Sequence, residues 1–220
     1  MKAFIRNLAL LPCLAFFVAL SGTAHAASIS GTVWENWSSN VPTIGSLPSA
    51  GSAAATFTTN GLSFCVDANE TNCTASTSYT LNGFLNSNLG SNGVSGVTFH
   101  NGAAGTNTLD NTLWEFTGSA FFTNGQTFQV AHDDGTIMYV NGSIVLNQPG
   151  PTSPVLSTIT YTGPTGMEDF TFLYGEVFGA PAVFDTTLGV APAVPEPSSI
   201  FLLGTGLLAA AGVVRRRLSI

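Results

Sequence analysis

The chain has 220 residues, only 8% of which are charged, and its formal net charge is −7. All five basic residues lie near the two ends, whereas eleven of the twelve acidic residues lie within residues 27–194, which contain no Lys or Arg. This distribution argues against nucleic-acid binding, because cationic side chains must neutralise the phosphates. It also excludes ordinary salt bridges within 27–194, so these carboxylates must be solvated, hydrogen-bonded or neutralised by a metal ion.

The N-terminus has the pattern of a secretory signal peptide. Two basic residues precede an apolar run over residues 8–20, and Ala24-His25-Ala26 provides a small-x-small cleavage site. A basic start, an apolar stretch of this length and such an exit sequence are typical of segments that are removed during export. We therefore expect residues 1–26 to form a signal helix that directs the chain to the Sec export machinery.

Residues 27–190 are long enough to form one domain with a sizeable core. Short alternating runs separated by turn residues predict an all-β sandwich or barrel, and no segment shows the 3.6-residue apolar period of a helix. The predicted strands cover residues 61–65, 96–99, 114–117, 127–130, 136–140, 143–146, 169–174 and 181–184. Asn141-Gly142 predicts a type I′ hairpin between two of them, since both residues accept positive φ.

The mature chain keeps two cysteines, Cys65 and Cys73. Export and an even number of cysteines favour a disulfide, since disulfides persist in oxidising compartments. Two cysteines without nearby histidines make a poor zinc site, so we expect a structural disulfide.

His132-Asp133-Asp134-Gly135, between two predicted strands, is the segment with the most recognisable chemistry. Adjacent aspartates repel each other, and no basic side chain lies near them in the sequence. Hard oxygen ligands without a cationic neighbour suit Ca²⁺, which accepts carboxylates and carbonyls in flexible geometry. The alternative is an Asp-Gly turn in which one aspartate caps backbone amides. These residues alone favour the turn.

The order of strand, Asp-Asp-Gly, strand, Asn-Gly and strand, followed by Phe172-Leu173-Tyr174-Gly175-Glu176 and Gly179-Ala180-Pro181-Ala182, resembles the PA14 family over residues 113–188. The resemblance implies a PA14-like antiparallel β-sandwich. In yeast flocculin-type adhesins of this family, paired aspartates joined by a cis peptide hold a Ca²⁺ ion that sugar hydroxyls coordinate. The resemblance therefore assigns calcium to Asp133 and Asp134.

The same resemblance implies a carbohydrate site formed by the two aspartates together with aromatic side chains, for which we select Tyr174 and Phe178. Those adhesins supply a further Asn ligand from a later loop, yet this chain has no Asn after Asn147. Glu176, or backbone carbonyls between residues 175 and 179, would have to take its place.

The C-terminal tail, residues 191–220, contains Val194-Pro195-Glu196-Pro197, an apolar run over residues 200–214 and Arg215-Arg216-Arg217. The prolines keep the motif extended. The run would form a helix of roughly 22 Å, which predicts a short transmembrane helix with the arginines as its cytoplasmic stop. The tail resembles the PEP-CTERM sorting signal of Gram-negative bacteria, which implies transient anchoring in the inner membrane and processing by an exosortase.

These features lead to one main hypothesis. The protein would be exported to the cell surface or extracellular matrix, bind carbohydrate with the help of calcium, and serve as an adhesin-like module linked to exopolysaccharide or biofilm. Its partners would be exosortase, the Sec machinery, an extracellular polysaccharide and, before processing, the membrane. The alternative is a structural matrix protein without a ligand site.

A polysaccharide-cleaving enzyme is the third possibility, because a glycosidase needs only two carboxylates at a fixed separation. No spacing in the sequence singles out such a pair. The nucleophile-elbow and zinc-protease motifs are also absent. We therefore expect no enzymatic activity.

Overall fold

The computed structural model describes residues 28–68, 73–190 and 205–206. Residues 26–193 form one compact unit, which contains all the strands described below. The predicted signal peptide, the motif at 194–197 and the arginines at 215–217 lie outside the described residues. So does the predicted membrane helix, apart from Thr205 and Gly206, which are helical. No described helix is long and apolar enough to cross a membrane.

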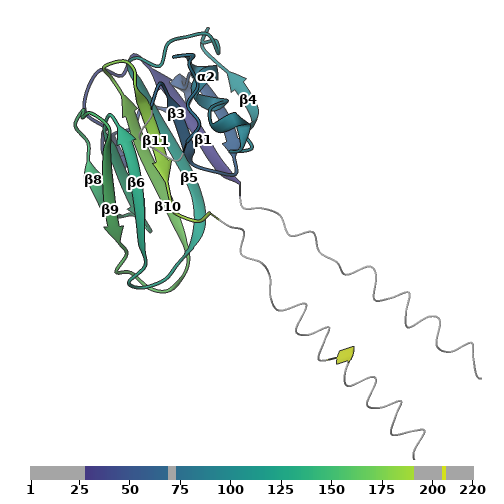
Figure 1. Ribbon diagram of the computed structural model, residues 1–220, viewed down its shortest axis with the longest axis vertical. Helices are drawn as coiled ribbons and strands as arrows, with labels where there is room; N and C mark the ends of the chain where they lie inside the picture. Colours follow the sequence, from purple (N-terminus) through teal and green to yellow (C-terminus); the bar gives the residue numbers. More distant parts are fainter. Residues whose placement is uncertain (1–27, 69–72, 191–204, 207–220) are drawn as a thin grey trace, which may run out of the picture. The chain divides into compact units, whose positions relative to one another are not determined.

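Two antiparallel sheets build the domain (Figure 1). The seven-stranded sheet contains, in spatial order, β4 (Ser95–Phe99), β2 (Ala55–Thr59), β1 (Ile29–Glu35), β5 (Thr112–Phe122), β10 (Gly166–Glu176), β7 (Thr136–Val140) and β8 (Ser143–Gln148). The four-stranded sheet contains β3 (Ser63–Val66), β11 (Ala182–Thr186), β6 (Thr127–Asp133) and β9 (Val155–Thr160). This arrangement confirms the predicted antiparallel β-sandwich.

The core between the sheets is rich in aromatic side chains. Along β5 and β10 every second residue points inward, which buries Trp114, Phe116, Phe172 and Tyr174 completely. Phe116 stacks on Phe184 of β11, with ring centroids 4.9 Å apart, and so joins one sheet to the other. The largest fully buried side chains of the described residues are aromatic ones.

A second, smaller core lies on the outer face of the seven-stranded sheet. The segment from Asn36 to Ala54, with the 3₁₀ turns η2 (Ile44–Ser46) and η3 (Ala50–Ser52), covers one end of that face. Its backbone is fixed by Tyr139, whose hydroxyl oxygen accepts a hydrogen bond from the Ile44 N–H at 3.2 Å. The rest of this outer face is not covered by that segment.

The eight predicted strands are all present, with ends that differ by a few residues. Three further strands, β1, β2 and β9, were not predicted. Their hydrophobic contrast is weak: Gly31 points inward from β1, and in β9 Leu156 is 59% exposed whereas Ser157 is buried. Gly31 is required because a Cβ there would overlap the ring of Phe57.

The domain also contains one short helix, α2 (Leu81–Leu85), a single turn that is too short to show an apolar period. Thr80 caps this turn by accepting a hydrogen bond from the Gly83 N–H at 3.1 Å. The helix places Phe84 against Tyr174, and the 3₁₀ turn η4 (Asn88–Gly90) follows it.

Two local predictions are confirmed. Asn141 and Gly142 both have positive φ, 48° and 74°, as a type I′ hairpin between β7 and β8 requires. Cys65 and Cys73 form a disulfide, which packs with Val183 and neighbouring alanines.

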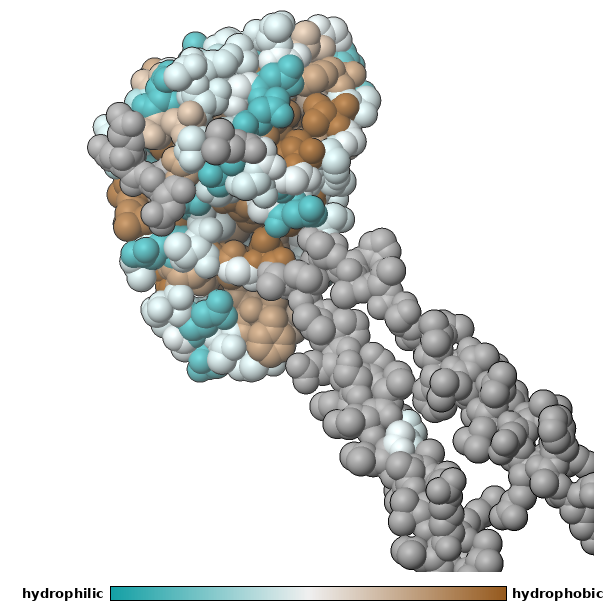
Figure 2. All heavy atoms as spheres, turned by 45° about the vertical axis from the view of Figure 1, so that its right-hand side comes forward, coloured by the Kyte–Doolittle hydropathy of each residue, from teal (hydrophilic) through white to brown (hydrophobic). Residues whose placement is uncertain are grey.

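Figure 2 shows that hydrophobic residues on the visible face form small groups among polar ones.

Candidate functional site

The Asp-Asp-Gly turn connects the two sheets, because β6 ends at Asp133 and β7 begins at Thr136. The peptide bond between Asp133 and Asp134 is cis, as the resemblance implies. Gly175 of β10 accepts a hydrogen bond from the Asp134 N–H at 3.2 Å and donates one to the Gly135 carbonyl at 2.9 Å. A Cβ on Gly135 would overlap the Pro149 carbonyl, so only glycine fits there.

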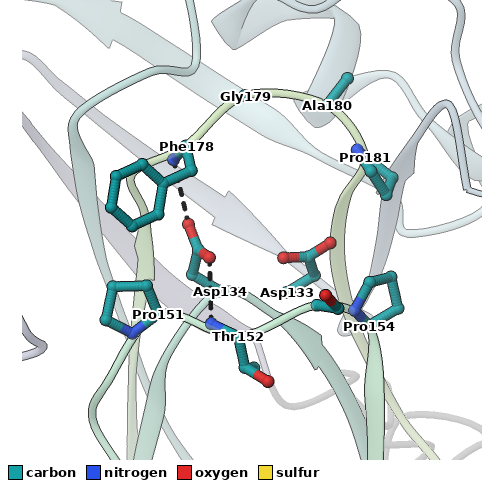
Figure 3. A pocket seen from close by; sticks show the side chains of 10 residues that line it. Asp133, Asp134, Pro151, Thr152, Pro154, Phe178, Gly179, Ala180 and Pro181 are labelled. Atoms are coloured by element: carbon teal, nitrogen blue, oxygen red, sulfur yellow. Dashed lines mark hydrogen bonds between the residues drawn. The ribbon is translucent and has the colours of Figure 1, made fainter.

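The Asp134 carboxylate holds two loops together (Figure 3). One oxygen accepts hydrogen bonds from the N–H groups of Val177 at 2.7 Å and Phe178 at 3.2 Å. The other accepts from the Thr152 N–H at 3.1 Å. Three amide donors compensate a carboxylate that is only 3% exposed. The capping role that the sequence offered as an alternative is therefore present at Asp134.

The two aspartates form one wall of a pocket of about 350 Å³. The β8–β9 loop, Pro151–Pro154, and the β10–β11 loop, Phe178–Pro181, form the rest of its lining. Figure 3 shows both carboxylates between these two loops. Phe178 is 78% exposed and offers an aromatic ring at the pocket, whereas Asp133 is only 5% exposed.

Tyr174 lies outside the pocket lining, which corrects its assignment to a sugar-stacking surface. It is completely buried, and its ring stacks on Phe84 and Phe184 at centroid distances of 5.8 and 5.2 Å. Its hydroxyl donates a hydrogen bond to the Asp133 carbonyl. Tyr174 therefore supports the turn from inside the core.

Glu176 is also turned away from the pocket, which corrects its assignment as a calcium ligand. Its side chain is fully buried, with carboxyl oxygens 2.8 Å from the Tyr79 hydroxyl and 2.9 Å from the Tyr174 hydroxyl. Burial raises the pKa of Glu176 to about 9, although the two tyrosine hydrogen bonds act in the opposite direction. Glu176 is therefore protonated at neutral pH, and the uncharged acid is a poor ligand for a hard cation.

A protonated Glu176 also resolves the hydrogen bonding of Tyr174, which has one hydroxyl hydrogen but two neighbouring oxygens. If the Tyr174 hydroxyl donates its hydrogen to the Asp133 carbonyl, the protonated Glu176 donates to the Tyr174 oxygen at 2.9 Å. The Tyr79 hydroxyl then donates to the other Glu176 oxygen. This chain of hydrogen bonds fixes the backbone beneath the aspartate pair.

His132 supports the turn from the other side, a role that no pattern in the sequence predicted. Its Nδ1 lies 2.6 Å from the Asp134 carbonyl and its Nε2 lies 2.8 Å from the side chain of Gln148. Burial lowers the pKa of His132, although its hydrogen bonds to the Asp134 carbonyl and to Gln148 act in the opposite direction. The Asp134 carbonyl can only accept, so Nδ1 donates to it. Nε2 faces Gln148 Oε1, an amide oxygen that also accepts a hydrogen bond from the Ser157 hydroxyl at 3.1 Å.

The donor set around the pocket decides which metal it could hold. Within the described residues, no three His, Cys, Asp or Glu side chains converge into a metal-binding group. The pocket instead offers two adjacent carboxylates, in a domain without Lys or Arg. Oxygen donors of this kind fit Ca²⁺ and would leave much of its six-to-eight-oxygen shell to water or a ligand.

The β8–β9 loop is the part of the pocket that the sequence analysis did not find. Pro151-Thr152-Ser153-Pro154 contributes the Thr152 amide and the surfaces of two prolines. The signal was present as two prolines that enclose a short polar segment, which is typical of a rigid exposed loop.

Comparison with known proteins gives a sequence match to the tail and structural matches to the domain. Residues 193–217 match the PEP-CTERM protein-sorting motif, which confirms that part of the sequence interpretation. No curated protein matches the chain significantly.

Among solved structures, a PA14 sugar-binding domain from an RTX adhesin is 20% identical, with a TM-score of 0.52, and the match covers 74% of this chain and 89% of that one. The PA14 domain of the MpAFP antifreeze protein is 19% identical, with a TM-score of 0.48, over 75% and 82% of the two chains. A GH31 alpha-xylosidase from Xanthomonas citri is 8% identical, with a TM-score of 0.40, over 74% of this chain and 15% of that one. The chain therefore combines a PA14-like β-sandwich with a PEP-CTERM protein-sorting motif.

Proposed function

We propose that this protein is exported, processed by an exosortase and delivered to the surface or extracellular matrix of a Gram-negative bacterium, where its PA14-like domain binds carbohydrate with the help of Ca²⁺. The sorting motif supports the route. The observation that carries the binding function is the pair of nearly buried carboxylates at a pocket in a domain without cationic side chains. A bound cation would offset the cost of burying these two negative charges.

Each pocket residue has a distinct task in this proposal. Asp133 and Asp134 would hold the Ca²⁺ ion, which supplies coordination positions for sugar hydroxyl groups. Asp134 does so mainly through the oxygen that accepts one hydrogen bond, because its other oxygen already accepts two. Phe178 presents an exposed ring at the pocket for the apolar face of a sugar.

Calcium titration of the compact domain, residues 27–193, tests the site by calorimetry and by melting temperature. We expect saturable heat and a calcium-dependent rise in stability, about 2.7 kcal/mol at a hundredfold excess over Kd. The double variant Asp133→Asn, Asp134→Asn should lose both effects. The charge-matched control Glu35→Gln, Asp185→Asn should keep them, because neither residue lines the pocket.

The calcium-dependent increment is the measured quantity, since the pocket variant also weakens hydrogen bonds to the loops. Glycan-array binding in calcium, repeated in EDTA, then tests for sugar. No heat and no stabilisation at millimolar calcium would contradict the calcium site. The Asp-Asp-Gly turn would then be purely structural, in keeping with a matrix protein that has no ligand site.

A further inference from the structure

The uncovered part of the outer face of the seven-stranded sheet carries an ordered set of polar side chains. The strand register places Ser30, Thr117 and Thr171 in one row across β1, β5 and β10. The next row pairs Ser119 with Asp169. These residues, together with Ser28, line a shallow groove of about 410 Å³. The groove is separate from the Asp133–Asp134 pocket, with which it shares no residue.

An apolar platform continues the groove. Phe121 and Met167 lie directly opposite each other on β5 and β10, one row beyond Ser119 and Asp169. Phe121 is 53% exposed and Met167 is 45% exposed, so their side chains stand on the same outer face. Directly opposed side chains have Cβ atoms about 4.5–5.5 Å apart, which makes the two residues one continuous surface.

One neighbour orients the carboxylate beside this platform, and another holds the backbone of the same residue. Asp169 accepts a hydrogen bond from the Ser119 hydroxyl at 2.6 Å, and its own N–H donates to the Asn141 side chain at 3.2 Å. An oriented carboxylate, hydroxyl groups that both donate and accept, and an exposed aromatic ring are the groups that a pyranose ring can use. Its hydroxyls form hydrogen bonds, and its apolar C–H face packs on the ring.

Charge selects the class of glycan. The exposed Asp169 gives this face negative charge, and the domain contains no Lys or Arg. An anionic polysaccharide would be repelled, whereas a neutral one would not. From Thr117 to Phe121 the face extends about 14 Å along β5, at 3.4 Å per residue, which suits a chain of several sugars rather than a single terminal one.

We propose that the outer face formed by Ser30, Thr117, Ser119, Phe121, Met167 and Asp169 is a second carbohydrate-binding site, which takes a neutral polysaccharide chain and needs no calcium. The site goes beyond the proposed function, because it uses neither the aspartate pair nor a metal ion. Two sites on one domain would allow it to hold two segments of a matrix polysaccharide.

Affinity electrophoresis of the domain, residues 27–193, tests this site in EDTA. The gels contain hydroxyethylcellulose, galactomannan or dextran, with alginate as the anionic comparison. We expect at least one neutral polymer to retard the protein and alginate to have no effect. Phe121→Ala and Asp169→Asn should each weaken retardation roughly tenfold. Leu156→Ala, which removes an exposed apolar side chain from the other sheet, should change nothing.

Several results would overturn the second site. They are the absence of retardation by all three neutral polymers, and a loss with Leu156→Ala as large as with Phe121→Ala. Retardation that EDTA or Asp133→Asn, Asp134→Asn abolishes would also overturn it, while supporting the calcium-dependent pocket. Circular dichroism melts of each variant identify unfolding, and Asp169→Glu provides a second variant that keeps the charge but displaces the carboxylate.

Discussion

The domain contains two pairs of adjacent acidic residues, and their surroundings differ. Asp133 and Asp134 are 5% and 3% exposed, and the Asp134 carboxylate accepts three backbone hydrogen bonds. Glu168 and Asp169 lie on β10, where Asp169 is exposed and bonds to side chains only through Ser119 and Asn141. Backbone amides of two loops therefore hold the Asp134 carboxylate, whereas a serine side chain of the neighbouring strand holds the Asp169 carboxylate.

This difference shows how burial changes the ligand that a carboxylate pair suits. Two nearly buried negative charges favour a cation, because water no longer screens their repulsion. An exposed carboxylate remains hydrated and acts as an ordinary hydrogen-bond acceptor for a neutral ligand. In the two proposals above, similar acidic pairs would therefore form a metal-dependent site in the pocket and a metal-independent one on the sheet.

The largest expected effect is a difference in the free energy of unfolding between two variants, each of which replaces one aspartate of one pair. Asp134→Ala leaves three amides without their acceptor, so we expect a loss of about 3–5 kcal/mol in the free energy of unfolding. Asp169→Ala should cost within about 0.5–1 kcal/mol, because the partners of this exposed side chain can turn to water. Urea denaturation of both variants in EDTA measures the two values. Equal losses would show that the pocket carboxylate is not a structural anchor.

The acid beneath the first pair should make stability depend on pH. The folded-state pKa of Glu176 is about 9, against 4.5 as its unfolded reference, so the folded state binds the proton more tightly. Its contribution is complete below pH 4.5 and declines as the pH rises towards 9, by about 3 kcal/mol between pH 4.5 and 7.

Glu176→Gln, which cannot ionise, should remove this decline. We expect the variant to gain stability relative to the wild-type domain as the pH rises, in melts between pH 4.5 and 8. Burial lowers the pKa of His132, which therefore destabilises the fold as the pH falls, but this effect is common to both proteins and cancels in the difference. A constant difference across the range would contradict a protonated Glu176.

The disulfide lies outside both proposed sites, so its removal tests whether ligand binding at these sites depends on the stability of the whole domain. Cys65→Ser, Cys73→Ser opens a nine-residue loop and should cost about 2–3 kcal/mol. Neither cysteine lines the pocket or the groove. Calcium and polysaccharide affinities, measured below the melting temperature, should therefore remain unchanged. A variant that loses either affinity would link that site to the β3 region.

The smallest expected effect is on the outer face. Phe121→Ala removes a side chain that is 53% exposed, so we expect a stability change within about 1 kcal/mol. Its matched partner is Phe178→Ala, which removes a 78% exposed ring at the pocket. Phe121→Ala should weaken only the polysaccharide binding that is measured in EDTA. Phe178→Ala should weaken only the glycan binding that requires calcium. If one variant lost both kinds of binding, the pocket and the outer face would have to be regarded as a single site.

The sequence predicted most strands in the second half of the domain, because these strands alternate clearly and turn residues define their ends. Asn141-Gly142 could be assigned to a hairpin from residue type alone. The strands β1, β2 and β9 could not, since small or polar residues occupy several of their inward positions. Their pairing depends on partners that are distant in the sequence.

The errors at the site have a similar physical origin. Tyr174 and Glu176 follow Phe170 and Phe172 at intervals of two, so the alternation already placed all four side chains on the inward face of β10. The family motif suggested Tyr174 and Glu176 as site residues, but it does not show towards which face of the sheet their side chains point. The β8–β9 loop joins the pocket only through tertiary packing, which no local pattern reveals.

The last strand gives the pocket a mechanical role. β11 directly follows the Phe178–Pro181 loop, pairs with β3 and β6, and places Val183 opposite Asp133. It is also the final strand before the tail that carries the sorting motif. A pull between a ligand held at Asp133 and an anchored tail would therefore be carried by β6 and β11 and the hydrogen bonds between them.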